Sequence, residues 1–128
     1  LWGRSALTKS ILHCATQTIT KNDMPILREN PTLTDIQNYV AELEKERGFA
    51  NQDVLQKCLM LGEEIGELFK AIRKQQNMSL DQNSKVGLAA DEMADILVML
   101  STVANRLDIN LEKAFRDKEE INKKRTWK

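Results

Sequence analysis

Apolar residues recur at intervals of three and four along most of the chain, which is the spacing of amphipathic helices. The two longest patterns run from about Gln52 to Gln75 and from Lys85 to about Leu107. The apolar row of the first consists of Val54, Cys58, Leu61, Ile65, Leu68 and Ile72, and that of the second consists of Ala89, Met93, Ile96, Leu100 and Val103. No segment alternates convincingly between apolar and polar residues. We therefore predict an all-α fold without strands.

Capping residues predict a further helix before these two. Thr32 with Asp35, or Thr34 with Gln37, can satisfy the free N–H groups of its first turn. Gly48 offers a stop at its C-terminal end. The far face of this helix consists of Glu42, Glu44, Lys45, Glu46 and Arg47. We interpret this face as solvated and as holding local ion pairs.

Two more helix starts are predicted by single capping residues. Ser84 can cap the second of the long helices, and Asn110 can cap a final helix. One row of the final helix contains Leu111, Phe115, Lys118, Asn122 and Arg125. With a weaker helix from Ala6 to Ile19, the chain would form an antiparallel bundle of four to five helices. We expect one domain over residues 24–128, preceded by an N-terminal extension of uncertain role over residues 1–23.

The composition is that of an ordinary globular protein, with 41% hydrophobic and 30% charged residues. Its 19 basic and 19 acidic residues give no net charge, which does not favour binding to a nucleic-acid duplex. Cys14 and Cys58 are too few for a disulfide framework or a thiolate zinc site, so we expect a reducing, cytoplasmic location. No apolar run approaches the roughly 18 residues that a membrane-spanning helix needs.

Acidic residues border the apolar rows of the two longest helices. Glu64 and Glu67 stand three apart on one helix, and Glu92 and Asp95 repeat this spacing on the next. Residues three apart lie on one face of a helix, so antiparallel packing could bring four carboxylates together. Like charges at such a distance repel each other unless a cation compensates them. We therefore predict a metal site.

Carboxylate oxygens without His or Cys favour hard cations, so we expect Mg²⁺, with Mn²⁺ as a substitute. Mg²⁺ usually binds through a few carboxylates together with substrate phosphates, which predicts a phosphate-bearing ligand. Glu63, turned about 100° around the helix from Glu64, is a candidate for positioning or deprotonating the attacking water. Lys57, Lys118 and Arg125 would supply positive charge for the phosphates.

The same acidic motif has a simpler interpretation. Taken alone, the pattern from Glu63 to Glu67 is most often a solvated face, and surface ion pairs are as plausible as substrate contacts for Lys57, Lys118 and Asn122. The chain would then be a helical oligomerisation or regulatory module without enzymatic activity. The metal site is favoured because both acidic pairs border apolar rows on consecutive helices and a Lys-Asn-Arg row follows them.

Three segments carry a resemblance to a known family. They are Leu61-Gly-Glu-Glu-Ile-Gly-Glu-Leu68, Asp91-Glu-Met-Ala-Asp-Ile-Leu97 and Lys118-Glu-Glu-Ile-Asn-Lys-Lys-Arg125-Thr-Trp. Together they resemble the MazG-like branch of the all-α nucleoside triphosphate pyrophosphohydrolases, over about Leu33 to Trp127. The paired motif EExxE and ExxD, in this order and with a helix-connecting spacer, is fairly specific.

This resemblance implies a helical bundle that forms a homodimer, and sometimes a homotetramer. It also implies Mg²⁺-dependent cleavage of a nucleoside triphosphate into the monophosphate and pyrophosphate. The residues that match metal ligands are Glu64, Glu67, Glu92 and Asp95, and those that match phosphate contacts are Lys118, Asn122 and Arg125. We expect a dNTP or a non-standard nucleotide as the substrate, in a house-cleaning role. Phosphoribosyl-ATP pyrophosphohydrolase, with a related fold and acidic motif, is the alternative enzyme.

Overall fold

A computed structural model of the chain describes residues 24–127. Its helices are α1 (Leu33–Glu46), α2 (Val54–Gln75), α3 (Ala89–Arg106) and α4 (Leu111–Asn122). The described part of the chain contains no strand, so the predicted all-α class is confirmed. The predicted helix from Ala6 to Ile19 lies outside the described residues. Within the described range, no helix is long and apolar enough to cross a membrane.

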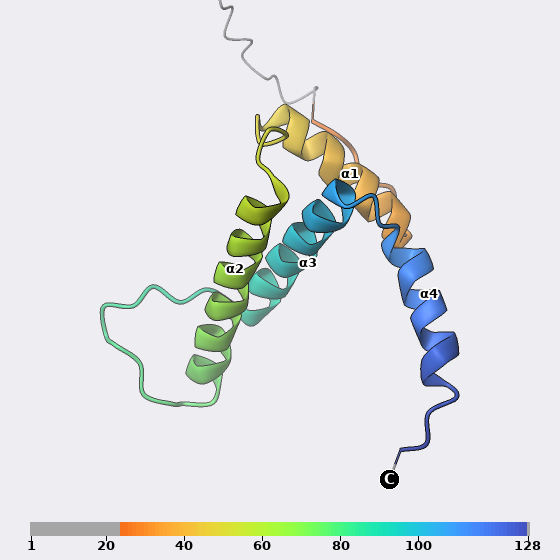
Figure 1. Ribbon diagram of the computed structural model, residues 1–128. Helices are drawn as coiled ribbons and strands as arrows, with labels where there is room; N and C mark the ends of the chain where they lie inside the picture. The colour runs from red at the N-terminus through yellow and green to blue at the C-terminus, as the bar shows by residue number, and fades with distance from the viewer. Residues whose placement is uncertain (1–23, 128) are drawn as a thin grey trace, which may run out of the picture.

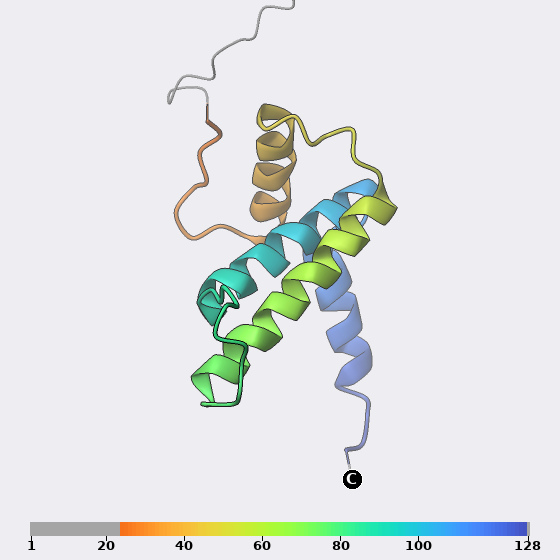
Figure 2. The same ribbon diagram turned by 90° about the vertical axis from the view of Figure 1, so that its left-hand side faces the viewer.

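The helices form an antiparallel pair crossed by a third helix, with the fourth leading away. α2 and α3 lie side by side and run in opposite directions, joined by a long loop that bows outward (Figure 1). α1 crosses the end of this pair at which α3 finishes (Figures 1 and 2). Within residues 24–127, α4 packs mainly against α1 and does not pack extensively against α2 or α3. One chain therefore forms an open arrangement of helices.

Side-chain caps begin three of the four helices within the described residues. Thr32 and Asp35 form the predicted capping box of α1. Thr32 Oγ1 accepts from the Asp35 N–H at 3.1 Å, and Asp35 Oδ2 accepts from the Thr32 N–H at 2.8 Å. Asp53 begins a second box at α2, and Asn110 caps α4 as predicted. These starts follow from local sequence because the donors and acceptors lie within three residues of each other.

The start of α3 differs from the prediction. This helix begins at Ala89, four residues after Lys85, and its N-cap Leu88 makes no side-chain hydrogen bond. Ser84 is held in a turn, because its backbone N–H donates to the Asp81 carbonyl at 3.0 Å. The predicted Ser84 cap is therefore wrong, since Asp residues favour local turns that compete with a helix start.

Substituting two of the predicted caps, Thr32 and Ser84, should distinguish the correct one from the wrong one. Thr32→Ala is expected to lower the free energy of unfolding by about 1 kcal/mol, because an N–H in the first turn of α1 loses its acceptor. Ser84→Ala is expected to leave it within about 0.5 kcal/mol of the wild type. Urea unfolding followed by circular dichroism measures both. Equal losses in the two variants would contradict the assignment of the caps.

Gln37, which is buried on α1, holds the corner between α3 and α4. Its Nε2 donates to Asn105 Oδ1 at 3.1 Å and to the Ile109 carbonyl at 2.8 Å. Its Oε1 accepts from the Leu111 N–H at 2.8 Å. Because Leu111 is the first residue of α4, these bonds determine where α4 begins relative to α1.

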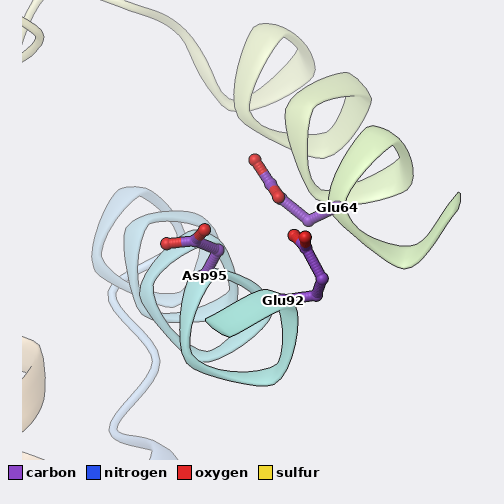
Figure 3. Close-up of side chains that lie close together, drawn as sticks. All are labelled: Glu64, Glu92 and Asp95. Atoms are coloured by element: carbon purple, nitrogen blue, oxygen red, sulfur yellow. The ribbon is translucent and has the colours of Figure 1, made fainter. Parts of the chain in front are cut away.

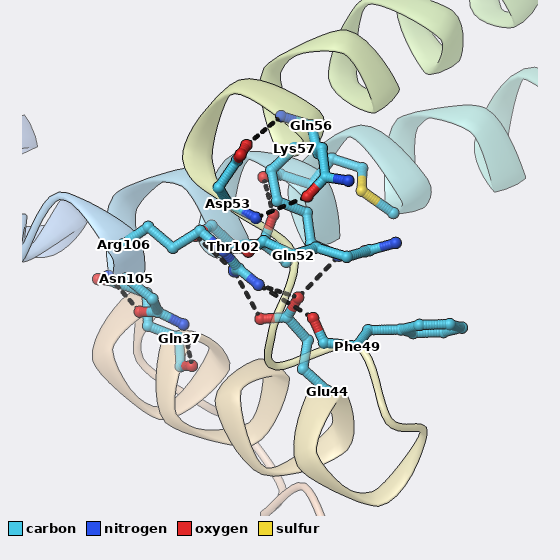
Figure 4. A network of polar contacts seen from close by, with 11 residues as sticks. Gln37, Glu44, Phe49, Gln52, Asp53, Gln56, Lys57, Thr102, Asn105 and Arg106 are labelled. Carbon is cyan, nitrogen blue, oxygen red and sulfur yellow. Dashed lines mark hydrogen bonds and ion pairs between the residues drawn. The ribbon is translucent and has the colours of Figure 1, made fainter.

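A buried group of charges joins α1, α2 and α3 (Figure 4). Glu44, 8% exposed, accepts from Lys57 Nζ at 2.8 Å and from two nitrogens of Arg106 at 2.9 and 3.0 Å. Arg106 also donates to the carbonyls of Phe49 at 3.2 Å and Gln52 at 2.6 Å. The interpretation of Glu44 as part of a solvated face is therefore wrong. Its partners come from other helices, and the spacing along α1 does not reveal them.

A single chain buries few apolar side chains. Among the described residues, the buried hydrophobic ones are Val40, Leu43, Ala71 and Ala104. The predicted apolar rows of α2 and α3 contain no fully buried residue, so they do not form a core within one chain. Apolar side chains more than half exposed on α2, α3 and α4 include Leu55, Leu59, Phe69, Met93, Phe115 and Ile121.

Candidate metal centre

Three carboxylates gather between α2 and α3 (Figure 3). One oxygen each of Glu64, Glu92 and Asp95 lies within 4.8 Å of the other two. Glu64 extends from α2, while Glu92 and Asp95 extend from α3 one turn apart. Antiparallel packing of the two helices thus brings together three of the four acids predicted to bind metal.

In the part of the chain that the structure describes, no basic side chain pairs with the acids of this cluster. Within residues 24–127, none of the three carboxylates forms an ion pair with Lys or Arg. Burial raises the pKa of Glu64 above its ordinary value, and the charges of Asp95, Glu92, Glu63 and Glu67 raise this pKa further. Ionised Glu64 is therefore destabilised, and a bound cation would relieve this destabilisation.

A hard divalent cation fits this set of donors. All three are carboxylate oxygens, the ligands that Mg²⁺ and Mn²⁺ prefer. Glu64 and Glu92 are half-buried, whereas Asp95 is exposed. The cluster is therefore held between two helices on one side and is open to solvent on the other. A site of this kind leaves room for a ligand to reach the bound cation.

The other two acids of the α2 motif lie apart from this cluster. Glu67 Oε1 accepts from Lys70 Nζ at 2.9 Å, in an ion pair whose side chains are 40% and 42% exposed. Glu63 is exposed on α2. Metal binding by Glu67 and water activation by Glu63 therefore stay predictions.

The predicted cationic row lies on and beyond α4. Lys118 and Arg125 are exposed, while Asn122 is half-buried and its Nδ2 donates to Glu119 Oε1 at 2.7 Å. α4 ends at Asn122, so the prediction of one helical row reaching Arg125 is wrong. Because α4 does not pack extensively against α2 or α3 within residues 24–127, this row lies apart from the carboxylate cluster there, and its contacts with phosphate stay predictions.

Lys57, predicted to contact phosphate, lies in the buried group of charges (Figure 4). Its side chain is 2% exposed, and its Nζ is bonded to Glu44 and lies 5.5 Å from the centre of the Phe49 ring. Its predicted contact with a substrate stays a prediction. Sequence reasoning did not identify Glu44 and Arg106 as its neighbours. The sequence did contain one signal that Glu44 is buried. Glu44 stands one turn after the apolar residue Val40, so both lie on the same face of α1, and the structure buries both.

Comparisons with known proteins identify proteins to which the chain is similar. Residues 52–126, which include α2, α3 and α4, match the family model of the MazG nucleotide pyrophosphohydrolase domain. The structure is similar to crystal structures of iMazG from Vibrio DAT 722. Ntag-iMazG has 28% sequence identity and a TM-score of 0.54, covering 73% of this chain and 95% of its own. Ctag-iMazG has 29% identity and a TM-score of 0.54, covering 73% and 99%. No curated protein matches the chain.

Proposed function

The chain belongs to the family of MazG nucleotide pyrophosphohydrolases and is a hydrolase of nucleotide anhydride bonds, and we propose that its reaction is Mg²⁺-dependent. The proposed substrate is a nucleoside triphosphate, standard or non-standard, cleaved to the monophosphate and pyrophosphate in the house-cleaning of nucleotide pools. The observation that carries this proposal is the uncompensated cluster of Glu64, Glu92 and Asp95 between two helices that the family model matches.

The proposed roles follow from the position of each acid. Glu64, Glu92 and Asp95 would hold the cation. Glu67 stands one helical turn after Glu64 and could join them if its ion pair with Lys70 breaks. Bound Mg²⁺ would neutralise charge that develops on the phosphate oxygens. Glu63, exposed and off the cluster, is proposed to position the attacking water or to accept its proton.

We propose that a second copy of the chain completes the site. The apolar rows of α2 and α3 are not fully buried in one chain, and Phe115 and Ile121 on α4 are 63% and 55% exposed. Exposed apolar surface of this kind is typical of subunit interfaces. A homodimer or homotetramer that buries it would also allow Lys118 and Asn122 of one copy to approach the acids of another and bind phosphates.

A nucleotide panel is expected to yield pyrophosphate and nucleoside monophosphate, and only when Mg²⁺ or Mn²⁺ is present. The panel contains the standard dNTPs, non-standard nucleoside triphosphates and phosphoribosyl-ATP, and chromatography identifies the products. Release of inorganic phosphate and a nucleoside diphosphate would contradict cleavage between the α and β phosphates. Hydrolysis of phosphoribosyl-ATP alone would identify the alternative enzyme.

Ligand binding separates an enzyme from a helical oligomerisation module. Mg²⁺ with a non-hydrolysable nucleotide should stabilise the fold by about 2.7 kcal/mol at a hundredfold excess over Kd. Thermal unfolding measures this effect. A chain that releases no product and gains no stability would be a module whose acids only solvate its surface.

A further inference from the structure

Gly87 comes directly before the N-cap of α3, and the side chain of Glu92 occupies the space beside it. A β-carbon at Gly87 would overlap Glu92 Oε1 and would lie 3.2 Å from the Glu92 carboxyl carbon. An overlap of this kind cannot be relieved without moving one of the two groups. No residue with a side chain therefore fits at position 87 while Glu92 keeps its place.

Backbone conformation does not account for this glycine. Among the described glycines, the one with a positive φ is Gly48, at 76°. Gly87 is not among the residues with a positive φ, so the left-handed region that favours glycine is not the reason for its presence. What the structure requires at position 87 is space.

Among the glycines that the structure describes, the close approach is found at Gly87 alone, and it follows from helix geometry. A β-carbon at Gly62 or Gly66, both on α2, would meet no atom within 4 Å. Glu92 lies in the first turn of α3, and side chains on a helix lean toward its N-terminus. The Glu92 carboxylate consequently lies back over the residue that precedes the N-cap.

The space at Gly87 affects the carboxylate cluster because Glu92, which occupies that space, is one of its three acids. In its present position Glu92 has an oxygen within 4.8 Å of oxygens from Glu64 and Asp95. Mg²⁺ demands nearly ideal octahedral geometry with ligands at about 2.0–2.1 Å, so a displaced carboxylate would bind it poorly. A methyl group at position 87 would displace this carboxylate by rotating a flexible side chain, which leaves the backbone of α3 in place.

We propose that Gly87 is a positioning residue for Glu92, because its missing side chain lets the Glu92 carboxylate lie where it faces Glu64 and Asp95. This inference rests on the proposed function, in which Glu92 binds the cation. It predicts that Gly87→Ala weakens binding of the divalent cation by about 10- to 100-fold, the effect typical of residues that orient metal ligands. The melting temperature of the metal-free protein should stay close to that of the wild type.

The test uses Mn²⁺ alone, with its free concentration followed by electron paramagnetic resonance, and thermal unfolding of each metal-free protein. The full chain is compared with Gly87→Ala, Glu92→Ala and the double variant. Gly62→Ala is the matched control, since it adds the same methyl group in open space. We expect Gly87→Ala to weaken binding in the wild-type background and to add nothing in the Glu92→Ala background, a coupling that a double-mutant cycle detects.

Each outcome distinguishes the inference from the proposed function on which it rests. If Glu92→Ala binds Mn²⁺ like the wild type, metal binding by Glu92 is wrong, and the proposed function fails with it. If Glu92→Ala weakens binding but Gly87→Ala does not, or if Gly87→Ala weakens it equally in both backgrounds, the positioning role is overturned. If Gly87→Ala alone fails to fold and the double variant folds, the conflict with Glu92 is supported. Failure of both to fold would assign Gly87 a backbone role and overturn the inference.

Discussion

Glu64→Gln is expected to lower Mg²⁺-dependent pyrophosphate release by at least about 100-fold while the helical fold stays intact. Glu64 is the acid that α2 contributes to the cluster with Glu92 and Asp95. Glutamine keeps the size of the side chain but removes its charge, and a metal centre typically contributes several kcal/mol to stabilising the transition state. The measurement is kcat/KM for the best substrate of the nucleotide panel, with circular dichroism of the same sample.

The same substitution should not destabilise the metal-free protein. Burial and the neighbouring acids raise the pKa of Glu64. A carboxyl group with a raised pKa contributes stability below its unfolded-state pKa, and this contribution is lost as pH rises through the folded-state pKa. At neutral pH in EDTA, Glu64→Gln is therefore expected to melt at the wild-type temperature or above it. This result is expected if Glu64 serves cation binding at a cost in stability.

Two further variants complete the test of Glu64. Asp95→Asn, which neutralises an acid of the same cluster from α3, should lose activity to a similar degree. Glu42→Gln, at an exposed position on α1, should keep it. Full activity in Glu64→Gln or in Asp95→Asn would show that the proposed metal site is wrong. Loss of activity together with loss of helical structure would instead indicate a structural role.

Glu44→Ala is expected to lower the free energy of unfolding by about 3–5 kcal/mol, which is a large part of the stability of a small domain. It removes an acid that Lys57 and Arg106 share, leaving two cations whose side chains are only 2% and 14% exposed. An uncompensated buried charge is costly because it has lost its hydration as well as its partner. The expected fall in melting temperature is at least about 10 °C.

The effect of Glu44 should depend on pH. Burial alone would raise the pKa of Glu44, but hydrogen bonds from Arg106 and Lys57 outweigh it and hold the pKa below its usual value. A carboxyl group with a lowered pKa contributes stability above its unfolded-state pKa, and this contribution is lost as pH falls through the folded-state pKa. The difference in stability between wild type and Glu44→Ala should therefore be full at neutral pH and shrink in acid.

Two further variants test whether the loss of stability in Glu44→Ala comes from the unpaired charges of Lys57 and Arg106. Glu42→Ala, also on α1 but exposed, should change the free energy of unfolding by no more than about 0.5 kcal/mol. Adding Lys57→Met to Glu44→Ala should recover part of the loss, because it removes one of the two unpaired cations. If Glu44→Ala costs no more than Glu42→Ala, the ion pairs of Glu44 do not stabilise the fold.

The acidic pairs illustrate how far spacing alone predicts a site. Glu92 and Asp95 stand one turn apart on α3, so their common face follows from the period of the helix. Glu64 and Glu67 have the same spacing on α2, yet only Glu64 joins the cluster, while Glu67 pairs with Lys70. Which of two acids on one face meets the next helix depends on how the two helices cross, and the spacing within each helix does not contain this information.

Local signals in the sequence determined the class of the fold, most helix boundaries and the helix faces on which the candidate metal-binding acids lie. The Thr32 and Asn110 caps, the apolar periodicity and the repeated acidic spacing each act within one helix, so the nearby residues specify them. Only the tertiary structure decided that Glu44 and Lys57 are buried as an ion pair, that α4 packs mainly against α1, and that Gly87 makes room for Glu92. The physical reason is that each of these depends on contacts between segments whose relative positions are set by packing.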